Sequence, residues 1–279
     1  MSDSKKPAQK LVEKLREDVN RVLEDARKLE LNPRSRSVLS GELQRSAAAL
    51  NALLADIDPI ERPTAIFDPG NPRTVGFFVA LALTAQTKKP LASLTSFYGG
   101  GIYALYYSGS YAAYKAIAGS ETPIYVGMAL YGASSKQKAL TLGTPLAGRL
   151  TEHRKNIERA KETLSLDDFS YRALVVQSGW EAPAEDYLIR MFRPLWNRET
   201  NILYGFGKHG DSSETRKNKR SPWDTLHSGR KWAIGEHQVD AKTSDEIIKA
   251  VESHFSNTKV FKKFQDVLND FVSHLQQVE

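Results

Sequence analysis

Residues 101–197 contain the side chains of this chain that are best suited to phosphoryl chemistry. Hydrolysis of a phosphodiester needs an attacking water, an acceptor for its proton, and stabilisation of the charge that grows on the phosphoryl and leaving oxygens. Phenols, an imidazole, a guanidinium, a carboxylate and an amide could share these tasks. In chain order the candidates are Tyr103, Tyr125, Arg149, His153, Glu185 and Asn197.

Three of these side chains have a role that their chemistry suggests directly. Arg149 carries a permanent charge on a planar fork, which suits the scissile phosphate. Glu185 is the best single metal ligand, because hard Mg²⁺ prefers carboxylate oxygen and commonly keeps several waters. We therefore expect one Mg²⁺ per active site, which would stabilise the phosphate charge and the leaving oxygen. Asn197 offers no charge, so we expect it to hold the site together by hydrogen bonding.

Two short strands should position the tyrosines. Residues 101–107 and 123–127 are rich in β-branched and aromatic residues and are separated by a Gly/Ser-containing segment, which predicts neighbouring antiparallel strands. Each strand has a tyrosine next to an isoleucine, and side chains alternate across a strand. Tyr103 and Tyr125 should therefore project from the face opposite their isoleucines and share one surface.

Helices should position the arginine, the histidine and the glutamate. Thr144 and Pro145 are typical of a helix start, with threonine as N-cap and proline at the first helical position. Arg149 and His153 follow four residues apart, hence on one face of that helix. A third strand over residues 169–176 should lead to a second helix from about residue 183 to residue 193, which carries Glu185 and ends at Pro194.

The order of these elements resembles the signature of the GIY-YIG nuclease superfamily. The matching positions are Gly101-Ile102-Tyr103, Tyr125-Val126-Gly127, Arg149 with His153, Glu185 and Asn197. The second motif has Val126 where the family name has isoleucine, and both residues are apolar and β-branched. Further dipeptides are similar to the type II restriction endonuclease branch, in particular to enzymes that cut CCGCGG. These are Phe97-Tyr98, Trp223-Asp224, Leu226-His227 and Gly229-Arg230.

The resemblance implies Mg²⁺-dependent hydrolysis of double-stranded DNA at a short GC-rich palindrome by direct attack of water. It also implies that Tyr103 is the general base. A phenol with an unperturbed pKa near ~10 is a poor base at neutral pH, and nearby cations could lower that pKa. His153 or Tyr125 could accept or relay the proton.

Two other functions compete with this interpretation. Repair and homing GIY-YIG nucleases typically append separate DNA-binding modules, and none is recognisable in this sequence. A catalytically silent DNA-binding module could use positive charge alone, but the presence of all six candidate side chains argues against it.

Composition favours a polyanionic partner and an intracellular setting. The net charge is +6, and the chain has no cysteine, which excludes disulfides and cysteine-ligated zinc. The start lacks an apolar signal core, and the longest apolar run, residues 75–83, is too short to span a bilayer. We expect a cytoplasmic protein with double-stranded DNA as its partner, and neither a membrane nor a small-molecule cofactor.

The pattern as a whole predicts an α+β fold with a small antiparallel sheet of three strands or slightly more, flanked by helices. We expect an N-terminal helical extension at 1–62, a catalytic domain at 63–235, and C-terminal helices at 236–279 that pack on the same core. Residues 58–73 contain four prolines and should form a stiff connector. Residues 74–87 are apolar nearly all round, which predicts a buried helix beneath the sheet.

The N-terminal extension should begin with an amphipathic helix at 8–30, whose apolar residues recur at a helical period. Its stripe needs a partner. That partner is either a second helix of the same chain, from about residue 41 to residue 56, or a second copy of the chain in a dimer.

A loop at 204–235 combines glycines, aromatic residues and basic residues. It is either a solvated loop or a DNA-reading loop, and loops carry binding residues disproportionately. Guanine would be recognised by arginine or lysine in the major groove. The DNA-binding candidates are Arg216, Lys217, Arg220, His227, Arg230 and Lys231. A palindrome needs matching chemistry on two strands, so we expect a homodimer or a higher homo-oligomer.

Overall fold

The computed structural model of the chain describes residues 5–29, 32–57, 60, 68–130, 143–176, 179–207, 219–233 and 239–276. The chain divides into two compact units, Met1–Thr64 and Ala65–Glu279. This division lies next to the expected boundary between residues 62 and 63. The second unit contains the sheet together with the C-terminal helices.

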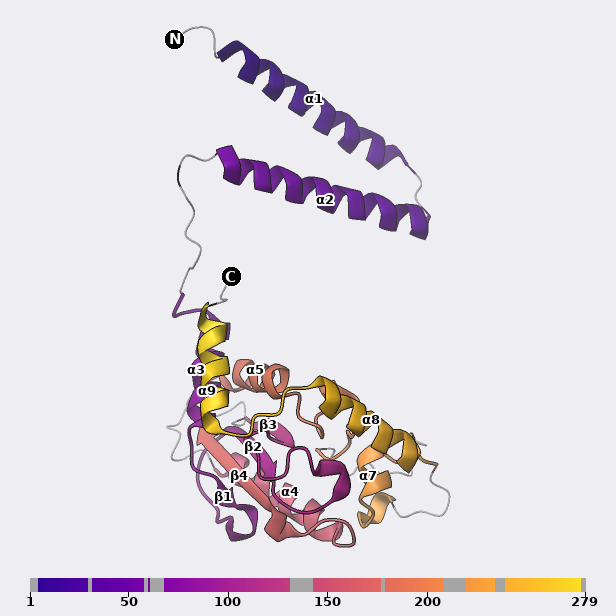
Figure 1. Cartoon of the computed structure of the whole chain (residues 1–279). Coiled ribbons are helices and arrows are strands. Elements are labelled where there is room, and N and C mark those ends of the chain that lie inside the picture. Colours follow the sequence, from indigo (N-terminus) through magenta and orange to yellow (C-terminus); the bar gives the residue numbers. More distant parts are fainter. Residues whose placement is uncertain are drawn as a thin grey trace. The chain divides into compact units, whose positions relative to one another are not determined.

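The first unit contains two long helices, α1 (Lys5–Lys28) and α2 (Pro33–Ile57) (Figure 1). α2 begins well before the expected residue 41. Among the described side chains of these two helices none is buried, so packing between them does not bury the apolar stripe. The large apolar residues that stay exposed on the two helices are Leu11, Val12, Leu15, Val19, Val22, Leu23, Val38, Leu43, Leu50, Leu53, Leu54 and Ile57.

The second unit is built on a four-stranded sheet in the order β1-β4-β2-β3, with every neighbouring pair antiparallel. The strands are β1 (Lys89–Pro90), β2 (Gly101–Tyr107), β3 (Tyr125–Ala129) and β4 (Phe169–Val175). The expected α+β class, with a small antiparallel sheet and flanking helices, is confirmed. β1 is an additional strand that the sequence analysis did not predict.

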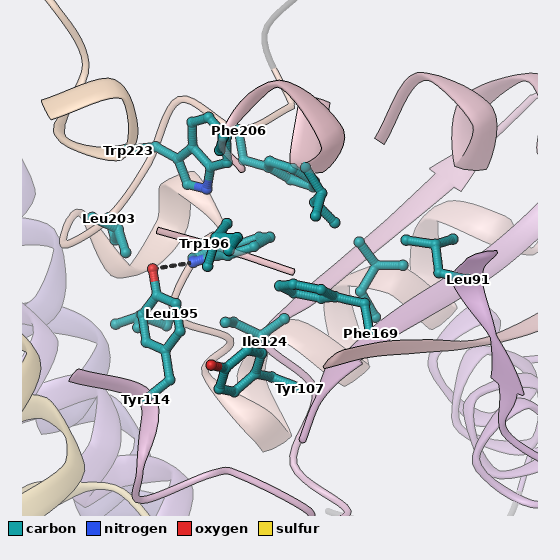
Figure 2. Packing of buried hydrophobic residues seen from close by; sticks show 14 of the residues in the cluster. Leu91, Tyr107, Tyr114, Ile124, Phe169, Leu195, Trp196, Leu203, Phe206 and Trp223 are labelled. Carbon is teal, nitrogen blue, oxygen red and sulfur yellow. Dashed lines mark hydrogen bonds between the residues drawn. The ribbon is translucent and has the colours of Figure 1, made fainter. Parts of the chain in front are cut away.

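Both faces of the sheet are covered, and every residue of the central strand β2 is buried. We call the face that carries Tyr103 and Tyr107 the site face. It packs against α4 (Pro145–Arg159), α7 (Pro222–Leu226) and α8 (Ser244–Asn257). Figure 2 shows the aromatic core of this face, where Trp196 donates a hydrogen bond from Nε1 to the Tyr114 hydroxyl at 3.0 Å.

The other face, which we call the opposite face, carries Ile102, Ala104 and Tyr106. It packs against α3 (Pro72–Thr84), α5 (Glu181–Phe192) and α9 (Phe264–Gln276). α3 is the helix expected at 74–87. Phe77 and Leu83 of α3 are buried, but Phe78 is 44% exposed, so α3 is not buried all round.

Local sequence explains where the helices that border the site begin and end. Pro145 occupies the first turn of α4, where a missing backbone N–H costs nothing. Thr144 precedes it as N-cap, but its side chain makes no capping hydrogen bond, contrary to expectation. α5 starts two residues earlier than expected and ends where Arg193 adopts a left-handed conformation before Pro194, which cannot continue a helix.

Among the described residues, no helix is both long enough and apolar enough to cross a membrane.

Candidate active site

The two tyrosines of the strand motifs lie together on the site face. The centroids of the Tyr103 and Tyr125 rings are 6.1 Å apart, and Ile102 projects from the opposite face as alternation requires. Ile124 does not follow the expected pattern. It precedes β3 and packs in the same cluster as the tyrosines, so the expectation that Tyr125 and Ile124 lie on different faces was wrong.

The glycines of the two motifs make room for close contacts. Gly127 pairs with Tyr103 across the sheet, and a Cβ at Gly127 would meet the Tyr103 hydroxyl at 2.4 Å. A Cβ at Gly101 would meet the carbonyl oxygen of Leu174 on β4 at 2.0 Å. A larger residue at Gly101 would therefore separate β2 from β4, and one at Gly127 would displace the phenol.

α4 brings its histidine and arginine to these tyrosines. His153 is buried, and its Nε2 forms a 2.6 Å hydrogen bond with the Tyr103 hydroxyl. Arg149 donates from Nη2 to the carbonyl oxygen of Gly207 at 2.8 Å and from Nη1 to Glu152 at 2.9 Å. The spacing of four residues thus places both side chains on the face of α4 that lies next to the phenols.

Burial dominates the electrostatics of the phenols. It raises the pKa of Tyr103 well above its ordinary value, the Tyr125 phenol raises it further, and the Arg149 guanidinium opposes both. Burial likewise raises the pKa of Tyr125, again against Arg149. The sequence analysis considered that nearby cations could lower the pKa of Tyr103. In the unbound protein, burial outweighs them.

Glu185 lies on α5 and is half-buried. Its pKa is raised to about 7, first by burial and then by the charge of Glu199, while the backbone of Met128 and the guanidinium of Arg149 oppose the increase. Glu199 follows Asn197 by two residues and was not singled out from sequence. A carboxylate with so high a pKa is one that a bound cation would stabilise in its charged form.

The donor set at Glu185 suits a hard cation that keeps most of its waters. Among the described residues there is no group of three or more His, Asp or Glu side chains that could enclose a metal ion. In the described part of the chain, therefore, protein side chains alone do not enclose a metal ion. Mg²⁺ fits a site of this kind, because it is commonly held by one or two carboxylates together with waters and substrate phosphate.

Asn197 is buried and pairs with the backbone of β3 inside the second motif. Its Oδ1 accepts from the Val126 N–H and its Nδ2 donates to the Val126 carbonyl, both at 2.9 Å. The amide thus occupies the free edge of β3 as a further strand would and fixes the residue between Tyr125 and Gly127.

Phe206 is part of the site, although sequence analysis did not single it out. Its ring stacks on the His153 imidazole, with centroids 4.5 Å apart and planes 17° apart, and it meets the Tyr125 ring edge-on at 5.3 Å. The only available signal was the position of Phe206 next to Gly205 and Gly207, which indicated a loop and nothing more.

A family model described as the Eco29kI GIY-YIG domain matches residues 95–255, more than half of the chain. The chain belongs to the Eco29kI GIY-YIG family. It is thus a GIY-YIG nuclease, and such nucleases act on DNA and generally depend on a divalent metal ion. The match runs from just before β2 to near the end of α8 and includes all six candidate residues, whereas α1, α2, α3, β1 and α9 lie outside it. No curated protein matches the chain.

Two DNA-binding candidates of this GIY-YIG nuclease are buried. His227 is bonded to the Tyr114 hydroxyl and, at 2.8 Å, to the Thr163 hydroxyl. Burial lowers the pKa of His227 to about 3, with a further contribution from the charge of Arg230. Arg230 is itself 1% exposed and ion-paired with Asp224. Neither side chain reaches the surface, so we do not retain them among the DNA-binding candidates.

The other four DNA-binding candidates divide into two groups. Arg216 and Lys217 lie outside the described residues. Arg220 is partly exposed and donates from Nε to Asp240 at 2.6 Å, and Lys231 is exposed. Arg220 and Lys231 remain available at the surface, and Arg220 would first have to leave Asp240.

Proposed function

We propose that the protein is a type II restriction endonuclease that hydrolyses double-stranded DNA at a short GC-rich palindrome, CCGCGG, with one Mg²⁺ per active site. The observation that supports this most strongly is the 2.6 Å hydrogen bond between Tyr103 and His153 beside Arg149. A proton acceptor, its relay and a phosphate-binding cation are adjacent there.

The chain's own residues divide the reaction as follows. Arg149 binds the scissile phosphate and balances the charge that develops on its oxygens. Tyr103 accepts a proton from the attacking water as its own proton passes to His153. The raised pKa of Tyr103 disfavours a standing phenolate, so the two transfers are coupled through the hydrogen bond. Tyr125 contacts both rings and orients them.

The remaining residues complete the site. Asn197 holds β3 and with it Tyr125. Glu185 would hold Mg²⁺, which supplies charge stabilisation at the phosphate and at the leaving oxygen. The attack is in line and leaves a 5′ phosphate, so chirally labelled phosphorothioate DNA should show inversion at phosphorus. Retention would contradict direct attack by water.

Two copies of the chain act on a palindrome, one on each strand, and a twofold dimer supplies this symmetry. The base-contacting candidates are the partly exposed Arg220 and the exposed Lys231, together with Arg216 and Lys217. Replacement of a true base contact should relax specificity at one base pair, whereas loss of a phosphate contact should weaken binding to all sequences alike.

A plasmid digest with Mg²⁺ and sequencing of the ends tests this function. The wild type should give discrete fragments with one shared GC-only palindrome, and Glu185→Ala should abolish them. Asp186→Ala is the matched control, because Asp186 is the next residue of α5 and is exposed beside Arg190; it should cut like the wild type. Nicking without a shared sequence would point to a repair-type nuclease, and tight binding without cleavage to a silent DNA-binding module.

A further inference from the structure

A buried ion pair lies behind the site, between α7 and the loop that carries Phe206. Arg230 donates to Asp224 from Nε at 2.6 Å and from Nη2 at 2.7 Å. The same guanidinium donates to the carbonyl oxygens of Gly205 at 3.0 Å and Phe206 at 3.2 Å. It also lies 4.5 Å from the centre of the Trp223 ring. One arginine thus fixes two consecutive peptide groups of the loop.

The loop that Arg230 holds supplies two contacts to catalytic groups. Phe206 stacks on the imidazole of His153 at 4.5 Å, and the next residue, Gly207, accepts the 2.8 Å hydrogen bond from Arg149. The stack defines the plane of the imidazole, and the carbonyl defines the direction of the guanidinium. Both orientations matter, because a displacement of about 1 Å in a catalytic group can cost roughly a hundredfold in rate.

We propose that Phe206, held by the Arg230–Asp224 pair, is a positioning residue that keeps His153 aligned with Tyr103. This inference rests on the proposed function and adds to its site the residues that hold the catalytic groups in place. A buried pair is a costly way to stabilise a loop, since well-packed apolar residues often stabilise as much or more. Here the pair fixes peptide carbonyls that no apolar side chain could hold.

The test compares two buried phenylalanines. Phe206→Leu removes the flat ring from the imidazole, and Phe192→Leu removes a ring of the same size that packs edge-on against Phe261 on the opposite face. Both variants lose similar core volume. We expect Phe206→Leu to lower the single-turnover cleavage rate about tenfold or more and to leave DNA affinity within about twofold, while Phe192→Leu keeps the wild-type rate.

Thermal unfolding of both variants separates positioning from stability. If Phe206→Leu cleaves as fast as the wild type, or if the two variants lose rate in proportion to their loss of stability, the positioning role is wrong. A wild-type protein that does not cleave DNA in the same assay would overturn the proposed function and this inference with it.

A second inference concerns the first unit and rests on a separate observation. Apolar residues of α1 recur at alternating spacings of four and three, which is the repeat of a coiled-coil seam. They are Ala8, Val12, Leu15, Val19, Val22 and Ala26, and Leu29 just after the helix continues the spacing. None of them is buried in the single chain, and Leu15, for example, is 48% exposed. Such a face is stable only against an apolar partner.

We infer that this face binds α1 of a second copy of the chain. Identical copies present the same repeat, so their seams match in spacing over the whole helix. The cleavage of two strands that we propose also requires two catalytic units, and an interface in the first unit would join them.

Sedimentation of the full chain without DNA tests this interface independently of cleavage. Leu15→Lys combined with Val22→Lys places charge in the seam, and Glu17→Lys combined with Glu24→Lys places lysines at the outer positions of the same turns. The wild type and the Glu17/Glu24 variant should sediment as dimers, and the Leu15/Val22 variant as a monomer. A monomeric wild type, or a dimeric Leu15/Val22 variant, would overturn the inference.

Discussion

The two faces of one small sheet serve different purposes. The opposite face buries mainly apolar side chains from α3, α5 and α9, and burial of this kind stabilises folded chains. The site face buries His153, Asn197, Asp224 and Arg230 among its aromatic rings. Buried polar groups cost free energy unless each is paired. The difference indicates that the opposite face contributes mainly to stability. The site face contributes less, because it buries the polar groups of the candidate site.

Two arginines should show the largest contrast. Arg149 borders the phenols of the site face, whereas Arg172 lies behind the sheet and bonds Tyr106 at 3.0 Å and Glu121 at 2.7 Å. Arg149→Lys should lower the cleavage rate by about 10²–10³, because it removes a planar donor to the developing charge. Arg172→Lys should lower the free energy of unfolding by about 1–3 kcal/mol and leave the rate unchanged. Single-turnover cleavage measures the rate, and urea unfolding measures the free energy of unfolding. If both variants changed the rate and the stability in the same way, the division of roles between the two faces would be contradicted.

Two glutamates should change stability in opposite directions. Burial raises the pKa of Glu185 to about 7. Burial would also raise the pKa of Glu121, but Arg172 and Lys88 bring it below its ordinary value. An acid whose pKa is higher in the folded state loses stability as pH rises from its unfolded value, near 4.5, through 7.

At pH 8 without metal, Glu185→Gln should therefore stabilise the protein by on the order of 1 kcal/mol, although we expect it to abolish cleavage. At pH 4.5 its effect on stability should vanish. Glu121→Gln should destabilise the protein at pH 8, because the charged form of Glu121 is the one that the fold favours. Thermal unfolding at the two pH values checks the direction of the stability change in both variants. If Glu185→Gln destabilised the protein at pH 8, the charged Glu185 carboxylate would not be unfavourable in the folded state.

Of Arg149, Glu185 and Asn197, Asn197 should have the smallest effect on the cleavage rate. Asn197→Ala removes two hydrogen bonds to the Val126 backbone and should cost about 1–3 kcal/mol of stability, with a loss in rate smaller than that of Arg149→Lys. Hydrogen exchange at the Val126 N–H should accelerate in the variant. Unchanged exchange would mean that β3 does not depend on this amide.

The sequence predicted the parts of the fold that depend on local patterns. β2, β3, β4 and α4 were predicted from alternation, composition and a proline at a helix start, and the family resemblance grouped their side chains. β1 was missed because two residues, one of them Pro90, carry no periodic signal. The sequence left open whether the apolar stripe of α1 packs on α2 or on a second copy of the chain, because periodicity alone does not show which apolar faces fit together.

The errors at the site arose from contacts between residues far apart in the sequence. Arg230 and His227 had the residue types of DNA-binding groups, and their burial depends on Asp224, Phe206 and Tyr114, whose positions only the fold determines. Phe206 has no chemistry of its own, so it acquires a role only once it lies against His153. Residue type and spacing therefore suggested which side chains react, but not which ones hold them.

The most direct test of the account compares two tyrosines of β2. Tyr103 and Tyr106 are both buried, and each hydroxyl is bonded to a basic side chain, His153 on the site face and Arg172 on the opposite face. Single-turnover cleavage of a DNA duplex with Mg²⁺ should be slowed by about 10² or more in Tyr103→Phe, the range expected for loss of a general base, with DNA affinity retained. Tyr106→Phe should cleave at the wild-type rate. Wild-type cleavage by Tyr103→Phe would contradict the assignment of that phenol to proton transfer.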